Sequence, residues 1–213
     1  MVRFSLLASS VLLGTAVAVP ITQDDSADSD AGLLEYLNLD PSDIKFQPIK
    51  GMPTLQDLNI TTTDLLDPAW RLSNGLPDPR NSSPNRKSTK ETTKDLQKRV
   101  EPQCYPYSQN AHISAAYACR DYLNSLGTTP CVVRGYLQQT AHCHADIASV
   151  GVAFVYGMPS YPSSYASSYC SDVARGLNWV LDNCLSQNPC RCGVAGQNAA
   201  WGNGGHVVSV QNS

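Results

Sequence analysis

All eight cysteines of this 213-residue chain lie in its C-terminal half, and this distribution limits the possible folds more than any other feature. Their positions are Cys104, Cys119, Cys131, Cys143, Cys170, Cys184, Cys190 and Cys192. An even number of cysteines in a short stretch favours a disulfide framework over a thiolate metal site when the protein matures in an oxidising compartment. The sequence therefore predicts four disulfides that stabilise a domain too small to depend on its core alone.

The N-terminus predicts export into such a compartment. Arg3 precedes a short apolar run, and small residues near Ala18 fit a signal peptide spanning residues 1–18. The run is interrupted by serines and is shorter than the roughly 20 apolar residues of a membrane-spanning helix. We therefore expect a secreted, extracellular protein without a membrane span.

Residues 19–99 have the composition of a propeptide. They hold 13 of the 18 acidic and 10 of the 15 basic residues, and they contain no cysteine. With few clustered apolar residues, the segment is predicted to be largely disordered. It ends at Lys98 and Arg99, the dibasic pair that a kexin-type processing protease recognises, so cleavage there would leave residues 100–213 as the mature domain.

Two glycosylation sequons fall in this propeptide, at Asn59 and Asn81. Both are candidate glycan sites of a precursor glycoprotein. Chance remains the alternative, because the segment is rich in Asn, Ser and Thr.

The mature domain has a readable order of elements. We expect a short strand at 105–107, a helix from a Ser108 or Asn110 cap to Gly127, strands at 131–137 and 147–156, a helix from a Ser163 or Ser164 cap to Cys184, and a strand at 204–210. This order favours an α+β fold, a small split-βαβ α/β sandwich with two helices on an antiparallel sheet. Cys170 and Cys184 would lie about 21 Å apart on one helix, so each must pair with another element.

Composition argues against several kinds of partner. A net charge of -3 and a charged fraction of 15% provide no basic field for nucleic acid or anionic membranes. No hydrolase, protease or phosphate-binding motif occurs, so the sequence favours neither an enzyme nor a cofactor.

Histidines are the main candidates for chemistry. His142 and His144 flank Cys143, and in an extended backbone they would share one side, where two imidazoles could hold a transition metal or form an acid/base pair. The alternative, which the sequence favours, is a polar, solvent-facing turn around a disulfide-bonded Cys143.

Aromatic residues give a second candidate site. Tyr161, Tyr165, Trp201 and His206 are predicted to form a rigid, weakly charged binding surface for a protein or a glycan. The alternative is that Tyr165 and its neighbour Tyr169 cover the second helix.

The leader at residues 1–18, the Lys98–Arg99 pair and the eight-cysteine βαββαβ pattern resemble small cysteine-rich secreted effectors of filamentous fungi, in particular those with a viral killer-toxin-like α/β sandwich. The resemblance implies kexin-type processing and binding, usually without catalysis, of a host or competitor protein or glycan outside the producing cell. It supplies no catalytic residues.

Two alternatives stay open. One is a secreted, ribonuclease-like histidine hydrolase, which a pocket joining His142 or His144 to His206 and a carboxylate would favour. The other is a structural protein of cell walls or adhesion.

Overall fold

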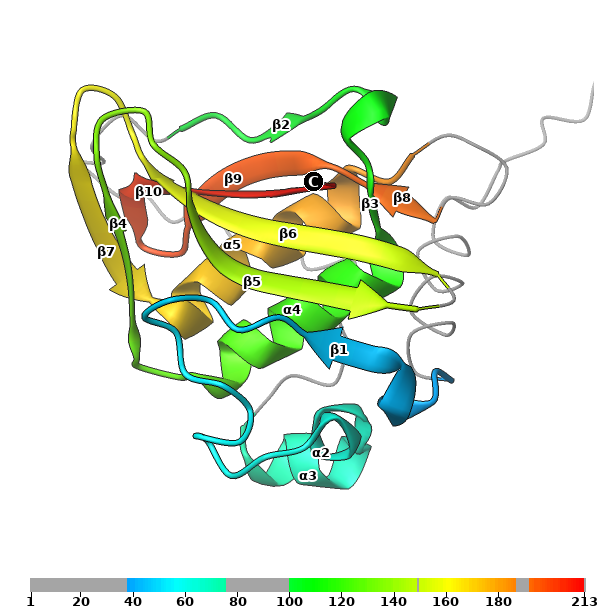
Figure 1. The fold of residues 1–213 in the computed structure, drawn as a ribbon. Coiled ribbons are helices and arrows are strands. Elements are labelled where there is room, and N and C mark those ends of the chain that lie inside the picture. The colour runs from blue at the N-terminus through cyan, green and yellow to red at the C-terminus, as the bar shows by residue number, and fades with distance from the viewer. Residues whose placement is uncertain (1–37, 76–99, 149, 187–191, 213) are drawn as a thin grey trace, which may run out of the picture.

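The computed structural model describes residues 38–75, 100–148, 150–186 and 192–212, and it has the α+β architecture that the sequence predicts. Within these ranges, six antiparallel strands form the main sheet in the order β1-β5-β6-β10-β9-β2. These strands are β1 (Ile44–Phe46), β2 (Gln103–Cys104), β5 (Thr140–Ile147), β6 (Gly151–Pro159), β9 (Gly196–Ala200) and β10 (Asn203–Gln211). Two helices, α4 (Ile113–Ser125) and α5 (Cys170–Asn183), cover one face of the sheet (Figure 1).

The remaining elements are short and lie around this sandwich. They are β3 (Ala111–His112) paired with β8 (Gly193–Val194), β4 (Pro130–Arg134) paired with β7 (Tyr165–Tyr169), helices α2 (Thr62–Leu66) and α3 (Pro68–Ser73), and the 3₁₀ turns η1 (Pro41–Asp43) and η3 (Tyr107–Gln109).

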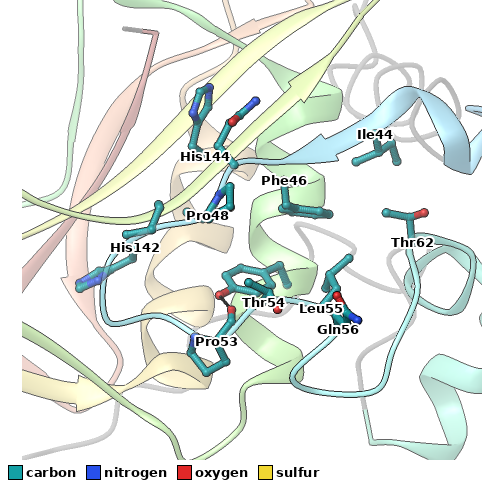
Figure 2. Close-up of a pocket in the computed structure, with 14 residues that line it drawn as sticks. Ile44, Phe46, Pro48, Pro53, Thr54, Leu55, Gln56, Thr62, His142 and His144 are labelled. Atoms are coloured by element: carbon teal, nitrogen blue, oxygen red, sulfur yellow. Dashed lines mark hydrogen bonds between the residues drawn. The ribbon is translucent and has the colours of Figure 1, made fainter.

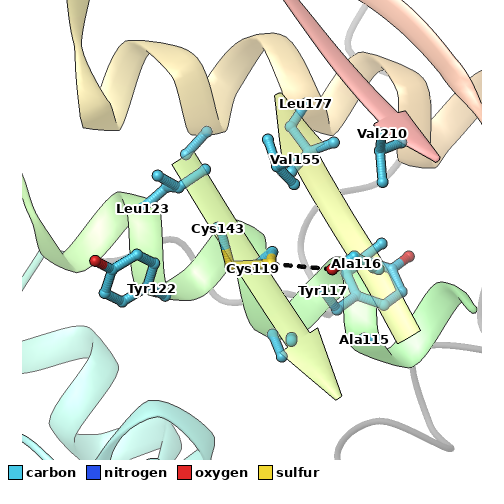
Figure 3. Packing of buried hydrophobic residues seen from close by; sticks show 14 of the residues in the cluster. Ala115, Ala116, Tyr117, Cys119, Tyr122, Leu123, Cys143, Val155, Leu177 and Val210 are labelled. Atoms are coloured by element: carbon cyan, nitrogen blue, oxygen red, sulfur yellow. Dashed lines mark hydrogen bonds between the residues drawn. A yellow bond between two sulfur atoms is a disulfide. The ribbon is translucent and has the colours of Figure 1, made fainter. Parts of the chain in front are cut away.

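The hydrophobic core lies between the two helices and the sheet. Leu123 of α4, Leu177 of α5 and Val155 of β6 are each fully buried there. A disulfide from Cys119 to Cys143 joins α4 to β5 through the middle of this core (Figure 3). The two helices are therefore fixed to the sheet by apolar burial and by a covalent bridge.

Two further bridges anchor α5, as the spacing of its cysteines predicted. Cys170 at its start is bonded to Cys131 of β4, and Cys184 at its end is bonded to Cys104 of β2. Cys192 is also disulfide-bonded, whereas Cys190 lies outside the described residues.

Both predicted helices form, but each begins later than the sequence suggested. Helix α4 begins after His112, whose Nδ1 accepts a hydrogen bond from the Ser114 amide at 3.3 Å, because residues 107–109 form η3 and residues 111–112 form β3. Helix α5 begins at Cys170 because residues 165–169 pair with β4. The strand expected at 131–137 therefore belongs to a two-stranded ribbon, β4 with β7, and not to the main sheet.

The strand expected at 147–156 spans the turn of a hairpin. Val150 donates a backbone hydrogen bond to Ile147 at 2.9 Å, and this turn connects β5 to β6. The prediction of a polar turn around Cys143 is wrong, because Cys143 lies inside β5, which pairs with both β1 and β6.

Residues 38–75, which we call the strap, are folded against the C-terminal domain. The strap supplies β1 to the sheet, and Leu65 of α2 is 1% exposed. Other apolar strap residues pack partly buried against the core cluster, namely Leu39, Phe46, Met52, Leu55, Leu58, Ile60, Leu66 and Trp70. The prediction that residues 19–99 are largely disordered is therefore wrong for the strap, because its scattered apolar residues are buried by another part of the chain.

A substitution at Gly176 tests the packing of α5 on the sheet. Alanine normally stabilises a helix interior by about 1 kcal/mol relative to glycine. Here a Cβ would lie 2.5 Å from the carbonyl oxygen of Ala199 in β9, so we expect Gly176→Ala to lower the free energy of unfolding by about 1–3 kcal/mol in urea denaturation. Arg175→Ala, on the exposed side of the same helix, is the control and should be near neutral. Stabilisation by Gly176→Ala would contradict the close contact of α5 with β9.

Candidate functional site

Two buried histidines meet across the central strand β6. His142 of β5 is 1% exposed and His206 of β10 is 0% exposed, and their Nε2 atoms are 3.3 Å apart. Gly157 of β6 pairs with both neighbouring strands and makes room for the two rings, because a Cβ at this position would collide with both Nε2 atoms. The glycine is needed for this close approach of side chains.

Irregular pairing accompanies both histidines. The register of β5 shifts between Ala141 and Cys143, and that of β10 shifts between Asn203 and Val207. A β-bulge breaks the alternation of faces and redirects a side chain. His142 is therefore buried together with the adjacent Cys143, which contradicts the expectation that His142 and His144 share one side.

Burial keeps both imidazoles neutral. It lowers the pKa of His142 to about 3, with a further contribution from the neighbouring His206, and it lowers the pKa of His206 to about 4. Both Nδ1 atoms are buried without a hydrogen-bond partner among the described residues. Within the described ranges, the pair therefore has no carboxylate of the kind that orients a catalytic histidine.

His144 has a different environment. Its ring stacks on Phe154 of β6 with centroids 3.8 Å apart, and burial lowers its pKa while Asp146 opposes the shift. Figure 2 shows His142 and His144 leaving β5 in different directions. In the part of the chain that the structure describes, no cluster of three or more side chains that could hold a metal ion occurs.

The site expected for a histidine hydrolase is not assembled in the described ranges. A cavity of about 280 Å³ includes His142 and His144 in its wall, but its lining contains neither His206 nor a carboxylate. His206 was also predicted to lie on the aromatic binding surface, and this prediction is wrong because the bulge buries it.

Exposed aromatic side chains follow the β4–β7 ribbon. Tyr165 and Tyr169 are 51% and 54% exposed and alternate along β7 with the buried Ala166. Tyr161 and Tyr136 pack with ring centroids 6.0 Å apart. About half of each of the Tyr165 and Tyr169 side chains is therefore on the surface.

Trp201 extends this aromatic row at the turn between β9 and β10. It is 63% exposed, and with Tyr169 it borders a hollow of about 360 Å³ that also contains Asp172 and Ser168. We name Tyr136, Tyr161, Tyr165, Tyr169 and Trp201 the aromatic row. Three of its members are residues that the sequence singled out, and the row offers flat apolar faces beside hydrogen-bonding groups.

The second surface lies beneath the strap. Strap residues Phe46 and Pro53, labelled in Figure 2, line the 280 Å³ cavity. Tyr122 of α4 also lines it, and its ring packs against that of Phe46 with centroids 5.4 Å apart. The Tyr122 hydroxyl donates a hydrogen bond to the Pro53 carbonyl oxygen. Arg71 of the strap forms a buried ion pair with Asp121 of α4. Sequence reasoning missed this pair, since nothing in the sequence signals that these two residues meet.

Other predicted sites have separate outcomes. Lys98, Arg99 and Asn81 lie outside the described residues. Asn59 is exposed in a loop of the strap, and the Thr61 of its sequon caps α2.

Across the ranges described, no helix combines the length and apolar character needed to cross a bilayer.

Comparison with known proteins identifies one relationship. No curated protein and no solved structure matches the chain. The sequence model of a family described as a domain of unknown function, DUF8794, matches residues 97–212, which include both helices, the described disulfides and the aromatic row. Because these residues make up more than half of the 213-residue sequence, the chain belongs to the DUF8794 family.

Proposed function

We propose that this chain is a secreted precursor that is cleaved after Arg99, and that the released disulfide-bonded domain acts without catalysis as an effector or toxin that binds a protein or glycan outside the producing cell. The observation that carries the proposal is the aromatic row on a scaffold fixed by disulfides. Exposed tyrosine and tryptophan contribute large contact areas at small entropic cost, because each side chain has few rotatable bonds.

The position of the row supports a binding role. The Cys131–Cys170 bridge joins the start of β4 to the junction of β7 and α5, so the ribbon that carries the tyrosines is fixed to the core. A rigid surface loses little conformational freedom when it binds. The matched family region begins at residue 97, beside Lys98 and Arg99, which supports the domain boundary proposed there.

Two measurements test the proposal. Intact mass of the exported protein, with and without reductant, should show an N-terminus at Val100 and the absence of free thiols. A mass that retains the strap, or free thiols in the exported protein, would contradict the processing scheme.

Trp201→Ala tests the binding surface. In a binding assay of the processed, labelled protein on surfaces of candidate target cells, we expect this variant to bind at least about 10-fold more weakly, as for a central aromatic contact. Arg175→Ala, an exposed substitution on α5, should bind like the wild type, and both variants should unfold at nearly the wild-type denaturant concentration. Separate treatment of the cells with protease and with glycosidases distinguishes a protein target from a glycan. Unchanged binding by both Trp201→Ala and Tyr161→Ala would contradict a role for the aromatic row.

A further inference from the structure

The strap adds a strand to one edge of the sheet. Within β1, Ile44 pairs with Ile147 and Phe46 pairs with Ala145 of β5, and the Gln47 amide donates to the His144 carbonyl oxygen at 3.0 Å. Without β1, β5 would be an edge strand with unpaired backbone groups. Such an edge pairs readily with another extended chain.

An arginine anchors the strap at a second point. Arg71 is 1% exposed, its guanidinium pairs with the carboxylate of Asp121, and it donates to the Leu65 carbonyl oxygen at 3.0 Å. The same carboxylate binds Arg120 at 2.8 Å. Asp121 is therefore a residue of the domain that binds a cationic side chain of the strap, the Arg71 guanidinium.

The interface between these two points is incompletely filled. A cavity of about 280 Å³ remains beside these contacts, lined by Phe46, Pro53 and neighbouring strap residues and by Tyr122, His142, Cys143 and His144 of the domain. The strap therefore encloses most of this space, and the four domain residues form the rest of its wall.

No disulfide holds the strap in place. All eight cysteines lie after residue 99, so the strap is joined to the domain by its noncovalent contacts and by the chain through Lys98 and Arg99. Cleavage after Arg99 would make the strap a separate, replaceable peptide.

We infer that the edge of β5, Tyr122 and Asp121 form a peptide-binding groove, which residues 44–71 occupy in the precursor and which an extended, arginine-bearing segment of a partner protein occupies after processing. The inference rests on the proposed cleavage after Arg99. Backbone pairing with β5 would provide affinity, and side chains in the cavity would provide selectivity. A segment without a cation would leave Asp121 without the ion pair that Arg71 supplies, which disfavours its binding.

The experiment uses the whole precursor, cleaved in vitro at Lys98–Arg99 by a kexin-type protease, and a fluorescent synthetic peptide of residues 38–75. The peptide is added in excess and its anisotropy is read at equilibrium, so that it exchanges with the severed strap. We expect saturable binding to the cleaved protein. A Lys98→Gln/Arg99→Gln precursor, which keeps its strap attached, should bind far less peptide.

Peptide variants leave the domain intact and test each contact. Arg71→Met should weaken binding by about 100-fold or more, the effect of removing one partner from a buried ion pair. Lys50→Met removes an exposed cation and is the matched control, which should bind like the wild-type peptide. Methylation of the Gln47 amide nitrogen should weaken binding by about 5- to 10-fold, because it removes one backbone hydrogen bond.

Several results would overturn the inference. The first is absence of peptide binding to the cleaved protein, and the second is equal binding of the Arg71→Met and wild-type peptides. The third is a dimer of the cleaved domain, formed through the β5 edge, that the peptide cannot dissociate into monomers. A displayed library of random peptides should yield arginine-bearing binders that the 38–75 peptide displaces, and binders without arginine would remove the role assigned to Asp121. A Trp201→Ala precursor should bind the peptide normally, so failure of the aromatic row is distinguishable from failure of the groove. Lack of natural cleavage after Arg99 would contradict the proposed function and leave the in-vitro result unaffected.

Discussion

Acidification from about pH 7 to about pH 4.5 is expected to lower the free energy of unfolding by about 5 kcal/mol through His142 and His206 alone. In the unfolded chain both imidazoles titrate near their ordinary pKa of about 6.5. In the folded protein burial lowers these pKa values to about 3 and about 4. Above pH 6.5 neither state takes up these protons, so the pair has no effect on stability there. As the pH falls below 6.5 only the unfolded state binds them, and each histidine removes about 1.4 kcal/mol per pH unit.

Urea denaturation at several pH values measures this dependence. A His142→Leu/His206→Leu variant is the control, and its stability should vary much less between pH 6.5 and pH 4.5, whatever its stability at neutral pH. Imidazole NMR signals of the wild type should show that neither residue reaches its titration midpoint in this interval. A titration midpoint near 6.5 for either ring would contradict the burial of the pair.

The second large effect is expected from the bridge between Cys104 and Cys184. It closes a loop with a sequence separation of 80, and its removal in a Cys104→Ala/Cys184→Ala variant should cost about 4 kcal/mol in denaturant unfolding, mainly because the unfolded chain gains freedom. Cys104 is exposed, so its replacement removes little packing, whereas Cys184 is 6% exposed and its replacement adds a smaller loss from the core. Gln103→Ala, an adjacent exposed substitution, should cost less than about 0.5 kcal/mol. If the double variant lost less than about 1 kcal/mol of its free energy of unfolding, this bridge would not restrict the conformational freedom of the unfolded chain.

The sequence predicted the parts of the fold that local pattern determines. Apolar residues at helical spacing located α4 and α5, and the cysteine positions at the two ends of α5 excluded a bridge between them. The start of α5 was placed too early because Ala166 continues the helical spacing, although β4 pairs with residues 165–169. Pairing with a distant strand is not encoded in local spacing.

Strand β5 was missed because its residues do not look like those of a buried strand. It contains two histidines and an aspartate, and a bulge interrupts its alternation. Gly157, inside an otherwise β-rich run, was the signal available for the histidine pair, since glycine within a strand often marks a close approach. Its partners, His142 and His206, are far apart in the sequence, and only the order of the strands brings them together.

The aromatic row was predictable in part, and the groove was not. Tyr161, Tyr165 and Trp201 were selected because they are aromatic in a weakly charged region, and all three are exposed. The Arg71–Asp121 pair connects a segment of propeptide composition with a helix, and neither residue stands out from its neighbours.

The strap also has a consequence for the order of synthesis. Its residues leave the ribosome before β5 and α4, the elements on which they pack, have been made. During that interval the β5 edge with which the strap pairs does not yet exist, and the strap must remain unaggregated. Its content of Asp, Ser, Thr and Pro, with apolar residues spread thinly, suits a polypeptide that waits in water for its docking partner. The composition that predicted disorder thus suits the strap during synthesis, before α4 and β5 exist. The strap folds only when these elements are available to pack against.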